Sequence, residues 1–471
     1  MPMSRRRWEI LAAVLIVLLA LGLRLHRLAD WSLGNDEIAE VRWASGSFPS
    51  MIDEVRNDKV HPPLDYIVQH LIGLTAAPEW VRRLPSVIAG TMTVLFVFLL
   101  GRWWVSPAAG LFAALMLTLA TNHVRYSQEV RPYSMAFFFV AASLVALELF
   151  SRKKRWWWAA GWIATVWLAG ATLYLAGVMA AVAGFTRIYL DRRETLAVLW
   201  RRLPLIVAAW TLLYLPWLHV VFRAARSVSP QPAERLDWPW WQLRLQVFGT
   251  GDWRFEPVSL GSWAFWLAVL IGLAVSVRHR PLRTAAAWLL LGSVLTVVFL
   301  QLRPHYQTPR YLMPAWIGAF PLAGAAVAVL FRRRLTAPLG VAILALVVGY
   351  NAITLRTYFR GERADWRGIA EYVHQRVQPG DTVLLTNNWV VRNFGWYWQR
   401  LPPRQGVAVE RFILQSHDFH GPAWIVTGQC LPRPPLDAAE VIQQYPMTEL
   451  AEVRYLAPES VLTMKEELCP E

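Results

Sequence analysis

The sequence WEILAAVLIVLLALGL at residues 8–23 is almost entirely apolar, and GNDEIAE follows it at residues 34–40. With a modest extension, the apolar run is long enough as a helix to cross a hydrocarbon core about 30 Å thick. Asp36 and Glu37 therefore follow the end of a membrane helix, where a charge is costly unless it faces water or lines a cavity that uses it. A solvated loop explains such a pair equally well, so the rest of the chain must decide.

Composition places the chain among membrane proteins. Of its 471 residues, 56% are hydrophobic, and long apolar runs recur along the sequence. The net charge of +15 does not require a nucleic-acid partner, because arginine clusters between apolar runs are typical of cytoplasmic loops. Many of the 27 tryptophans stand at the ends of the runs, as in the aromatic belts of membrane proteins. We expect a multi-pass protein of the lipid bilayer that binds no nucleic acid.

Eleven apolar segments are predicted to span the membrane. They cover residues 8–28, 80–101, 107–122, 132–150, 156–169, 170–190, 203–223, 259–277, 284–302, 310–331 and 336–356. With the basic residues 5–7 in the cytoplasm, alternation makes every later cytoplasmic loop short and rich in arginine or lysine, as the positive-inside rule requires. An odd number of spans puts the C-terminal segment outside. We therefore predict a membrane protein with a cytoplasmic N-terminus and an extracytoplasmic C-terminal domain.

The loops predicted to lie outside carry unusual polar sequences. Loop 29–79 holds the acid pair and continues with HPPLDYI from His61, where Pro63 can begin an interfacial helix over residues 64–76. Residues 122–134 read NHVRYSQEVRPYS, and residues 303–311 read RPHYQTPRY. Arginine outside the membrane contradicts the positive-inside rule, so these arginines need another role.

Phosphate binding would explain these outer arginines. The guanidinium group forms bidentate, charge-assisted hydrogen bonds with phosphate and keeps its proton. A lipid phosphate is the natural anion at a membrane surface, and we interpret Arg125, Arg131 and Arg310 in this way. Salt bridges or headgroup contacts are the better interpretation for four others: Arg24, Arg27, Arg223 and Arg226.

Five motifs, taken in order, resemble the GT-C superfamily of membrane glycosyltransferases. They are Asp36-Glu37, His61-Pro62-Pro63-Leu64-x-Tyr66, Arg83-Leu84-Pro85-Ser86, Tyr126-Ser127-Gln128-Glu129-x-Arg131-x-Tyr133-Ser134 and Arg310-Tyr311-Leu312-x-Pro314. Within that superfamily the set looks like the bacterial glycosyltransferase family 39 group, relatives of protein O-mannosyltransferases and of the aminoarabinose transferase of lipid A. The resemblance extends to about residue 320 and fits the C-terminal part only loosely.

The resemblance implies that a sugar passes from a polyprenyl-phosphate donor to a lipid, glycan or protein hydroxyl. It also implies that this happens on the outer face of a bacterial inner (plasma) membrane. It implies that Asp36 takes the acceptor proton, with Glu37 as its neighbour and Glu129 as a second acid. We predict that the donor phosphate is bound by Lys59, His61, Arg83, Arg125, Arg131, Arg310 and Tyr311. We predict that the substrate pocket includes Tyr66, Tyr126 and Tyr133.

The sequence departs from the family pattern at two positions. His61 stands where some relatives carry a lysine before the proline pair, which makes its charge depend on pH. Ala171-Thr172-Leu173-Tyr174 replaces a His-Tyr pair of many relatives, which weakens any transfer of acceptor specificity. Neither the sugar nor the acceptor follows from the sequence. No metal-ligand spacing is present, no cofactor is predicted with certainty, and a need for a divalent metal stays open.

Two other classes of function are compatible with many apolar spans. A lipid-linked sugar flippase or a secondary transporter would also carry charges within the membrane, but a transporter is expected to place them near the midplane and to contain repeated halves. In this chain the acids stand at outer helix ends, and no internal repeat is visible. A non-catalytic scaffold is the third possibility, and the acid pair argues against it.

A domain boundary is predicted near residue 358, where the composition becomes that of a soluble protein. A transmembrane domain of residues 1–358 would then precede a small α/β domain of residues 359–471 that acts as a lid or docks the acceptor. Its predicted helices cover 366–377, a segment ending near 399, and 436–445, and its predicted strands cover 382–386, 424–427, 450–456 and 461–465. The only cysteines, Cys430 and Cys469, are predicted to form a disulfide if this domain lies outside.

Overall fold

The computed structural model of this chain describes most of its residues. The described ranges are 5–58, 61–75, 77–193, 196–226, 235–251, 258–302, 309–361, 365–385, 388–411, 419–420, 422–428, 440–445, 451–456 and 461–462. The chain divides into two compact units. One contains residues 1–26 and 43–356, and the other contains residues 27–42 and 357–471.

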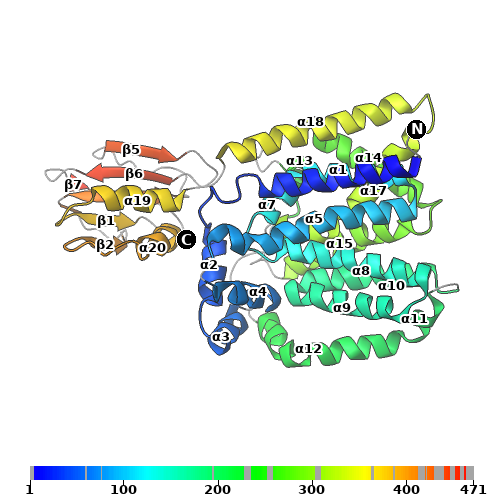
Figure 1. Cartoon of the computed structure of the whole chain (residues 1–471), viewed down its shortest axis with the longest axis horizontal. Coiled ribbons are helices and arrows are strands. Elements are labelled where there is room, and N and C mark those ends of the chain that lie inside the picture. The colour runs from blue at the N-terminus through cyan, green and yellow to red at the C-terminus, as the bar shows by residue number, and fades with distance from the viewer. Residues whose placement is uncertain are drawn as a thin grey trace. The chain divides into compact units, whose positions relative to one another are not determined.

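The larger unit is a bundle whose long helices run side by side (Figure 1). Its elements are α1 Arg5–Leu25, α3 Phe48–Asp58, α4 Leu64–Gly73, α5 Glu79–Trp104, α6 Pro107–Leu119, α7 Thr121–Ser127, α8 Tyr133–Lys153, α9 Trp156–Thr172, α10 Tyr174–Leu190, α11 Ala197–Arg201, α12 Leu203–Arg226, α13 Trp238–Thr250, α14 Leu260–Ser276, α15 Leu282–Leu302, η2 Pro309–Leu312, α16 Met313–Trp316, α17 Ala319–Leu330 and α18 Ala337–Gly361, whose last residues belong to the second unit.

Each of the eleven predicted spans coincides with a helix or with a bent pair of helices. Among the described residues, five helices are long and apolar enough to cross a membrane. The number rises to seven if two bent pairs each count as one span, namely α6 with α7, bent by 65°, and residues 310–316 with α17, bent by 45°. The predicted polytopic helical architecture is therefore confirmed.

Local sequence signals mark where several of these helices begin. The Ser106 hydroxyl accepts a hydrogen bond from the Ala109 N–H at the start of α6, and proline follows Ser106 at the first helical position, where its missing N–H costs nothing. Ser259 caps α14 in the same way by accepting from the Ser262 N–H. These caps satisfy backbone N–H groups that would otherwise be costly at a helix end.

Small residues allow the helices of the bundle to pack closely. A Cβ added at Gly110 of α6 would lie 2.4 Å from the Phe98 carbonyl oxygen of α5. A Cβ added at Gly324 of α17 would lie 2.3 Å from the Ala109 carbonyl oxygen of α6. Close backbone approach of this kind is how helices associate in lipid, where the hydrophobic effect gives little driving force. Alanine at either position would force the helices apart.

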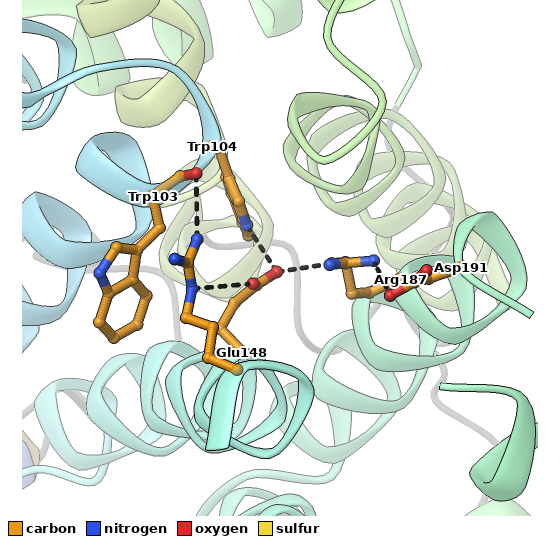
Figure 2. A network of polar contacts seen from close by, with 6 residues as sticks. Trp103, Trp104, Glu148, Arg187 and Asp191 are labelled. Atoms are coloured by element: carbon orange, nitrogen blue, oxygen red, sulfur yellow. Dashed lines mark hydrogen bonds and ion pairs between the residues drawn. The ribbon is translucent and has the colours of Figure 1, made fainter. Parts of the chain in front are cut away.

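An ion-pair network around the buried carboxylate of Glu148 joins the C-terminal ends of α5, α8 and α10 (Figure 2). The Glu148 carboxylate accepts hydrogen bonds from Trp104 Nε1 at 2.9 Å and from Arg187 Nε at 2.5 Å. Arg152 Nε lies 3.8 Å from the other Glu148 oxygen, and Arg187 Nη1 lies 3.4 Å from Asp191 Oδ2. Two acids and two arginines therefore balance each other here, and we call these four residues and Trp104 the Glu148 network.

Within the loop predicted over residues 29–79, the described residues form three helices before α5 begins. The predicted interfacial helix at 64–76 is present as α4, which begins directly after Pro63. Helix α2 (Asn35–Ala44) and helix α3 were not predicted. Both are short, so their apolar faces contain few residues. Met51 and Val55 of α3 nevertheless pack against Tyr66 of α4 in a small hydrophobic cluster.

The second unit is built on a five-stranded mixed sheet. Its elements are α19 Trp366–Arg376, β1 Thr382–Leu385, α20 Asn388–Trp398, β2 Ala408–Arg411, β3 Phe419–His420, β4 Ala423–Gly428, β5 Glu440–Tyr445, β6 Ala451–Leu456 and β7 Val461–Leu462. The strand order is β2-β1-β4-β6-β5, with β1 parallel to β2 and β4, and β6 antiparallel to β4 and β5. Strands β3 and β7 form a separate antiparallel pair. The predicted α/β class is confirmed.

One predicted element of this unit is wrong. Residues 436–445 were expected to form a helix, but residues 440–445 form strand β5, and residues 436–439 lie outside the described part of the chain. The segment EVIQQY carries apolar residues at Val441, Ile442 and Tyr445, a spacing that also suits one helical face. The segment is a strand because it pairs antiparallel with β6, in a register that runs from Glu440 opposite Tyr455 to Tyr445 opposite Ala451. Cys430 and Cys469 also lie outside the described residues, so their disulfide stays a prediction.

Residues 27–42 fold with the C-terminal part of the chain, although they follow the first helix in sequence. The Leu33 N–H donates to the Tyr397 hydroxyl at 2.6 Å, and the Trp366 N–H donates to Ser32 Oγ at 3.0 Å. Trp31 packs edge-on against Tyr358, with ring centroids 4.8 Å apart. The second unit therefore contains the acid pair in addition to the predicted domain at 359–471.

Candidate active site

The centre of the candidate site in the helical unit is Tyr133, the first residue of α8. The Arg131 Cζ lies 5.6 Å from the centroid of the Tyr133 ring, and the Arg310 Cζ lies 5.5 Å from the same centroid. The two arginines are far apart in sequence, and η2 brings Arg310 to this position. Two guanidinium groups therefore converge on one aromatic ring, at distances typical of cation–π contacts.

Three further side chains complete this group. Arg131 Nη2 lies 3.2 Å from His61 Nε2. The centroid of the Tyr126 ring lies 5.0 Å from that of the Tyr133 ring. The ring centroids of Tyr311 and His61 lie 6.4 and 6.5 Å from the same Tyr133 centroid. All are buried except Arg310, which is half-buried. We call the following six residues the Tyr133 cluster: His61, Tyr126, Arg131, Tyr133, Arg310 and Tyr311.

Arg125 and Glu129 border this cluster. They form an ion pair of 3.3 Å one helical turn apart, and both are partly exposed. Arg125 directly precedes Tyr126 in α7, and Glu129 stands three residues after Tyr126. The structure thus brings eight of the predicted site residues together from three distant parts of the sequence. The catalytic role predicted for Glu129 stays a prediction.

Hydrogen bonds to α5 hold the short connection between α7 and α8 that carries Arg131. The Ser86 hydroxyl donates to the Arg131 carbonyl oxygen at 3.4 Å, and the Ser134 hydroxyl donates to the Ser86 carbonyl oxygen at 2.9 Å. Pro132 stands just before α8, where a residue without an N–H does not break the helix. These contacts within the sequence RPYS at 131–134 therefore hold the backbone of Arg131 and Tyr133 in place against α5.

Arg24 belongs to a buried polar network that the sequence interpretation missed. It was expected to form a salt bridge or to reach lipid headgroups, but its side chain is completely buried. Its Nε donates to Ser127 Oγ at 3.2 Å, and its Nη2 lies 2.7 Å from His123 Nδ1. Gln128 Nε2 donates to the Arg24 carbonyl oxygen at 2.9 Å. The sequence did contain a signal for this burial. An arginine at the end of an apolar run can be buried when a polar segment elsewhere in the chain supplies hydrogen-bond partners.

Three other predicted site residues are not seen in the Tyr133 cluster. Tyr66 is buried against Met51 and Val55, and its ring lies 5.9 Å from that of Trp43. Arg83 is buried on α5. Lys59 lies outside the described residues. The donor-binding and substrate-pocket roles of these residues stay predictions.

The acid pair lies in the second unit, at the start of α2. Glu37 is buried, and its Oε2 accepts a hydrogen bond from the Gly34 N–H at 2.9 Å, as in a capping arrangement at a helix N-terminus. Asp36 is partly exposed, and Asn35 Nδ2 lies 3.5 Å from its Oδ1. Acids in the first turn also interact favourably with the helix dipole. Glu37 therefore stabilises the helix start, whereas Asp36 is the more accessible carboxylate.

No metal site is formed by the residues that the structure describes. Among them, no group of three or more His, Cys, Asp or Glu side chains is placed to hold a metal ion.

Comparison with known proteins identifies related sequences and folds. The family model described as dolichyl-phosphate-mannose-protein mannosyltransferase matches residues 60–219, a range that includes His61, Arg131 and Tyr133. No curated protein matches the sequence. Solved structures match far more of the chain.

ArnT from Cupriavidus metallidurans, bound to undecaprenyl phosphate, matches with a TM-score of 0.57 and 15% identity over 96% of this chain and 98% of that one. The GT-C fold is the fold of this chain. AglB, the archaeal oligosaccharyltransferase from Archaeoglobus fulgidus, in complex with an inhibitory peptide and a dolichol-phosphate, matches with a TM-score of 0.57 and 12% identity over 83% of this chain and 63% of that one. The GT-C fold accounts for the bundle of apolar helices and makes this chain a multi-pass membrane protein.

Proposed function

We propose that this chain is a membrane glycosyltransferase that moves a sugar from a polyprenyl-phosphate donor to an acceptor hydroxyl. The observation that carries the proposal is the convergence of Arg131 and Arg310 on the ring of Tyr133, beside His61. The match of residues 60–219 to a mannosyltransferase family model supports it. So does the shared fold of ArnT, whose structure holds undecaprenyl phosphate.

The Tyr133 cluster has the chemistry that a leaving phosphate requires. When the bond between the anomeric carbon and the phosphate oxygen breaks, both electrons stay on that oxygen and negative charge grows on the phosphate. Preorganised cationic donors in a site with little water stabilise such charge strongly. Guanidinium groups suit this role because they remain protonated and offer several N–H donors in a fixed plane.

The proposed base is Asp36, and the sequence resemblance supports this assignment. The acceptor oxygen forms a bond to the anomeric carbon while its proton passes to the Asp36 carboxylate, and polyprenyl phosphate leaves. The partly exposed side chain of Asp36 suits this role better than the buried, capping side chain of Glu37. We propose that the reaction takes place on the outer face of a bacterial inner membrane, with the N-terminus in the cytoplasm.

Binding of undecaprenyl phosphate to the purified protein in nanodiscs tests the phosphate site. We expect Arg131→Gln and Arg310→Gln each to weaken binding by about 10- to 100-fold, the scale of one lost charged hydrogen bond. Arg152→Gln is the matched control, because Arg152 also lies over an aromatic ring, that of Trp103 at 5.1 Å, but at the other end of α8. If both Arg131 and Arg310 variants bind as tightly as the wild type, the phosphate site is wrong.

Turnover of the Asp36→Asn variant tests the base. We expect its rate to fall by about 10²- to 10⁴-fold, the usual contribution of general base catalysis, while undecaprenyl phosphate binding stays within twofold of the wild type. The control is Asp30→Asn, since Asp30 lies in the same unit in an exposed ion pair with Arg27. Loss of folding in Asp36→Asn, seen as a lower melting temperature, would instead make Asp36 a structural residue.

A further inference from the structure

A pocket of about 580 Å³ lies within the second unit, between α2 and α20. One face of α20 and its C-terminal extension supplies most of the lining, at residues 388, 391, 392, 395, 396, 399 and 400. This spacing of three and four residues places those side chains on one side of the helix. Helix α2 contributes Ile38 and Arg42, one turn apart. The size is that of a small-molecule site.

The residues that line the pocket combine positive charge with an aromatic surface. Three of them are arginines, Arg42, Arg392 and Arg400, and no acid is among the lining residues that the structure describes. All three arginines are exposed, so their substitution does not threaten the core. Trp396 and Gln399 supply an aromatic ring and an amide beside them. The exposed arginines therefore make the rim of the pocket cationic, while Ile38, Val391 and Trp396 add apolar surface to its lining.

Arg400 is held in a fixed position across the tryptophan. Its Cζ lies 3.3 Å from the centroid of a Trp396 ring, and its Nη1 donates to the Trp396 carbonyl oxygen at 2.6 Å. A stacked guanidinium loses little conformational freedom when it binds a ligand, because it is already oriented. The Arg400 guanidinium group brings a positive charge to the pocket, and guanidinium groups form charge-assisted hydrogen bonds with anions.

We infer that this pocket binds an anionic saccharide, a sugar that carries phosphate or carboxylate, as part of the acceptor. The inference rests on the proposed function, because it names the acceptor class of the same transferase. The arginines bind the anionic substituent, while Trp396 and Gln399 contact the apolar face and the hydroxyls of the sugar.

The two faces of α2 connect this pocket to the proposed base. At about 100° per residue, Asp36 and Glu40 lie on the side of α2 opposite Ile38 and Arg42. The pocket and the Asp36 carboxylate are thus separated by roughly one helix diameter, about 10–12 Å with side chains. An acceptor anchored by its anionic group in the pocket would need a hydroxyl-bearing part long enough to reach around α2 to Asp36.

Calorimetric titration of full-length protein in phosphatidylcholine nanodiscs tests the inference, with glucose 6-phosphate, glucose and inorganic phosphate as probes. We expect glucose 6-phosphate to bind more tightly than either glucose or inorganic phosphate. Arg392→Gln and Arg400→Gln should each weaken its binding tenfold or more, because each removes a charged donor.

Arg376→Gln is the matched control. Arg376 of α19 stacks on Tyr372 at 3.7 Å and donates to the Tyr372 carbonyl oxygen, as Arg400 does on Trp396, but it does not line the pocket. An equal loss of binding in Arg376→Gln would show general charge attraction and overturn the site. So would wild-type binding in both pocket variants.

Two further outcomes separate the parts of the argument. Inorganic phosphate that binds as tightly as glucose 6-phosphate would overturn the saccharide assignment. Glucose 6-phosphate binding that depends on Arg392 and Arg400, in a protein that fails to bind undecaprenyl phosphate, would uphold the pocket and reject the proposed transferase.

Discussion

The two ends of helix α8 carry charged groups of opposite design. The ring of Tyr133, at the first position, has the guanidinium groups of Arg131 and Arg310 within 6 Å of its centroid. Glu148, fifteen residues later and about 22 Å along the axis, forms ion pairs with Arg152 and Arg187. In the Glu148 network each arginine meets a carboxylate (Figure 2). In the Tyr133 cluster both arginines lie against an aromatic ring.

The difference shows what each region contributes. The negative charge of the buried Glu148 carboxylate is compensated within the protein by two arginines and a tryptophan N–H. Removal of the carboxylate would leave the charge of a buried arginine uncompensated. A cation–π contact orients a guanidinium group but leaves it positive. We therefore expect the Glu148 network to stabilise the bundle, and we propose that the Tyr133 cluster binds an anionic ligand. Four predictions test this contrast.

The largest effect is expected from Arg131→Gln combined with Arg310→Gln. Loss of two charged hydrogen bonds of about 1.5–3 kcal/mol each should lower kcat/KM by about 10³-fold or more. Steady-state kinetics with a polyprenyl-phosphate sugar donor measure this, and thermal unfolding of the same sample reports stability. Retained activity with a large loss of stability would make the Tyr133 cluster structural and erase the contrast.

Glu148→Gln is expected to have the largest effect on stability. It leaves Arg187 buried without its principal carboxylate, which should cost about 3–5 kcal/mol of unfolding free energy. Denaturant unfolding in detergent measures the change, and undecaprenyl phosphate binding should stay within twofold of the wild type. Weaker donor binding by Glu148→Gln would contradict the separation of roles.

Tyr133 substitutions sharpen the role of the ring. The Tyr133 hydroxyl has no hydrogen-bond partner among the described residues, so Tyr133→Phe should bind undecaprenyl phosphate nearly as the wild type does. Tyr133→Leu removes the surface beneath both guanidinium groups and should weaken binding about tenfold, the scale of cation–π contacts. Equal affinities of the Phe and Leu variants would show that the ring does not orient the arginines.

The smallest effect is expected from Arg152→Gln. Its side chain is 46% exposed and lies 3.8 Å from a Glu148 oxygen. Exposed ion pairs contribute about 0–1 kcal/mol, so the unfolding free energy should change by no more than that. A loss comparable to that of Glu148→Gln would mean that Arg152, rather than Arg187, is the main partner of the carboxylate.

Sequence patterns predicted the spans well because membrane helices need long apolar runs. The segment predicted at 80–101 lies within α5, and the motif at 126–134 contains Tyr126, Arg131 and Tyr133 of the cluster. Convergence of Arg310 on Tyr133 does not follow from local patterns, since it depends on how distant helices pack. From the sequence alone, these residues could be grouped only by their similar chemistry and by the family resemblance.

Other features escaped prediction for identifiable physical reasons. Helices α2 and α3 are too short for a clear periodicity, and the spacing of apolar residues in 440–445 suits a strand and a helix alike. The burial of Arg24 depends on Ser127 and His123, about a hundred residues away. A pattern within one helix does not show which way such an arginine points.

The folding of residues 27–42 with the C-terminal part has a consequence for protein engineering. A truncated protein ending at residue 358 would keep every predicted span but would remove Trp366 and Tyr397, the partners of Ser32 and Leu33. The helix that carries Asp36 would then lose its own scaffold. Chimeras between relatives should therefore exchange residues 27–42 and 357–471 as a single module, because these two segments, distant in the gene, fold as one piece.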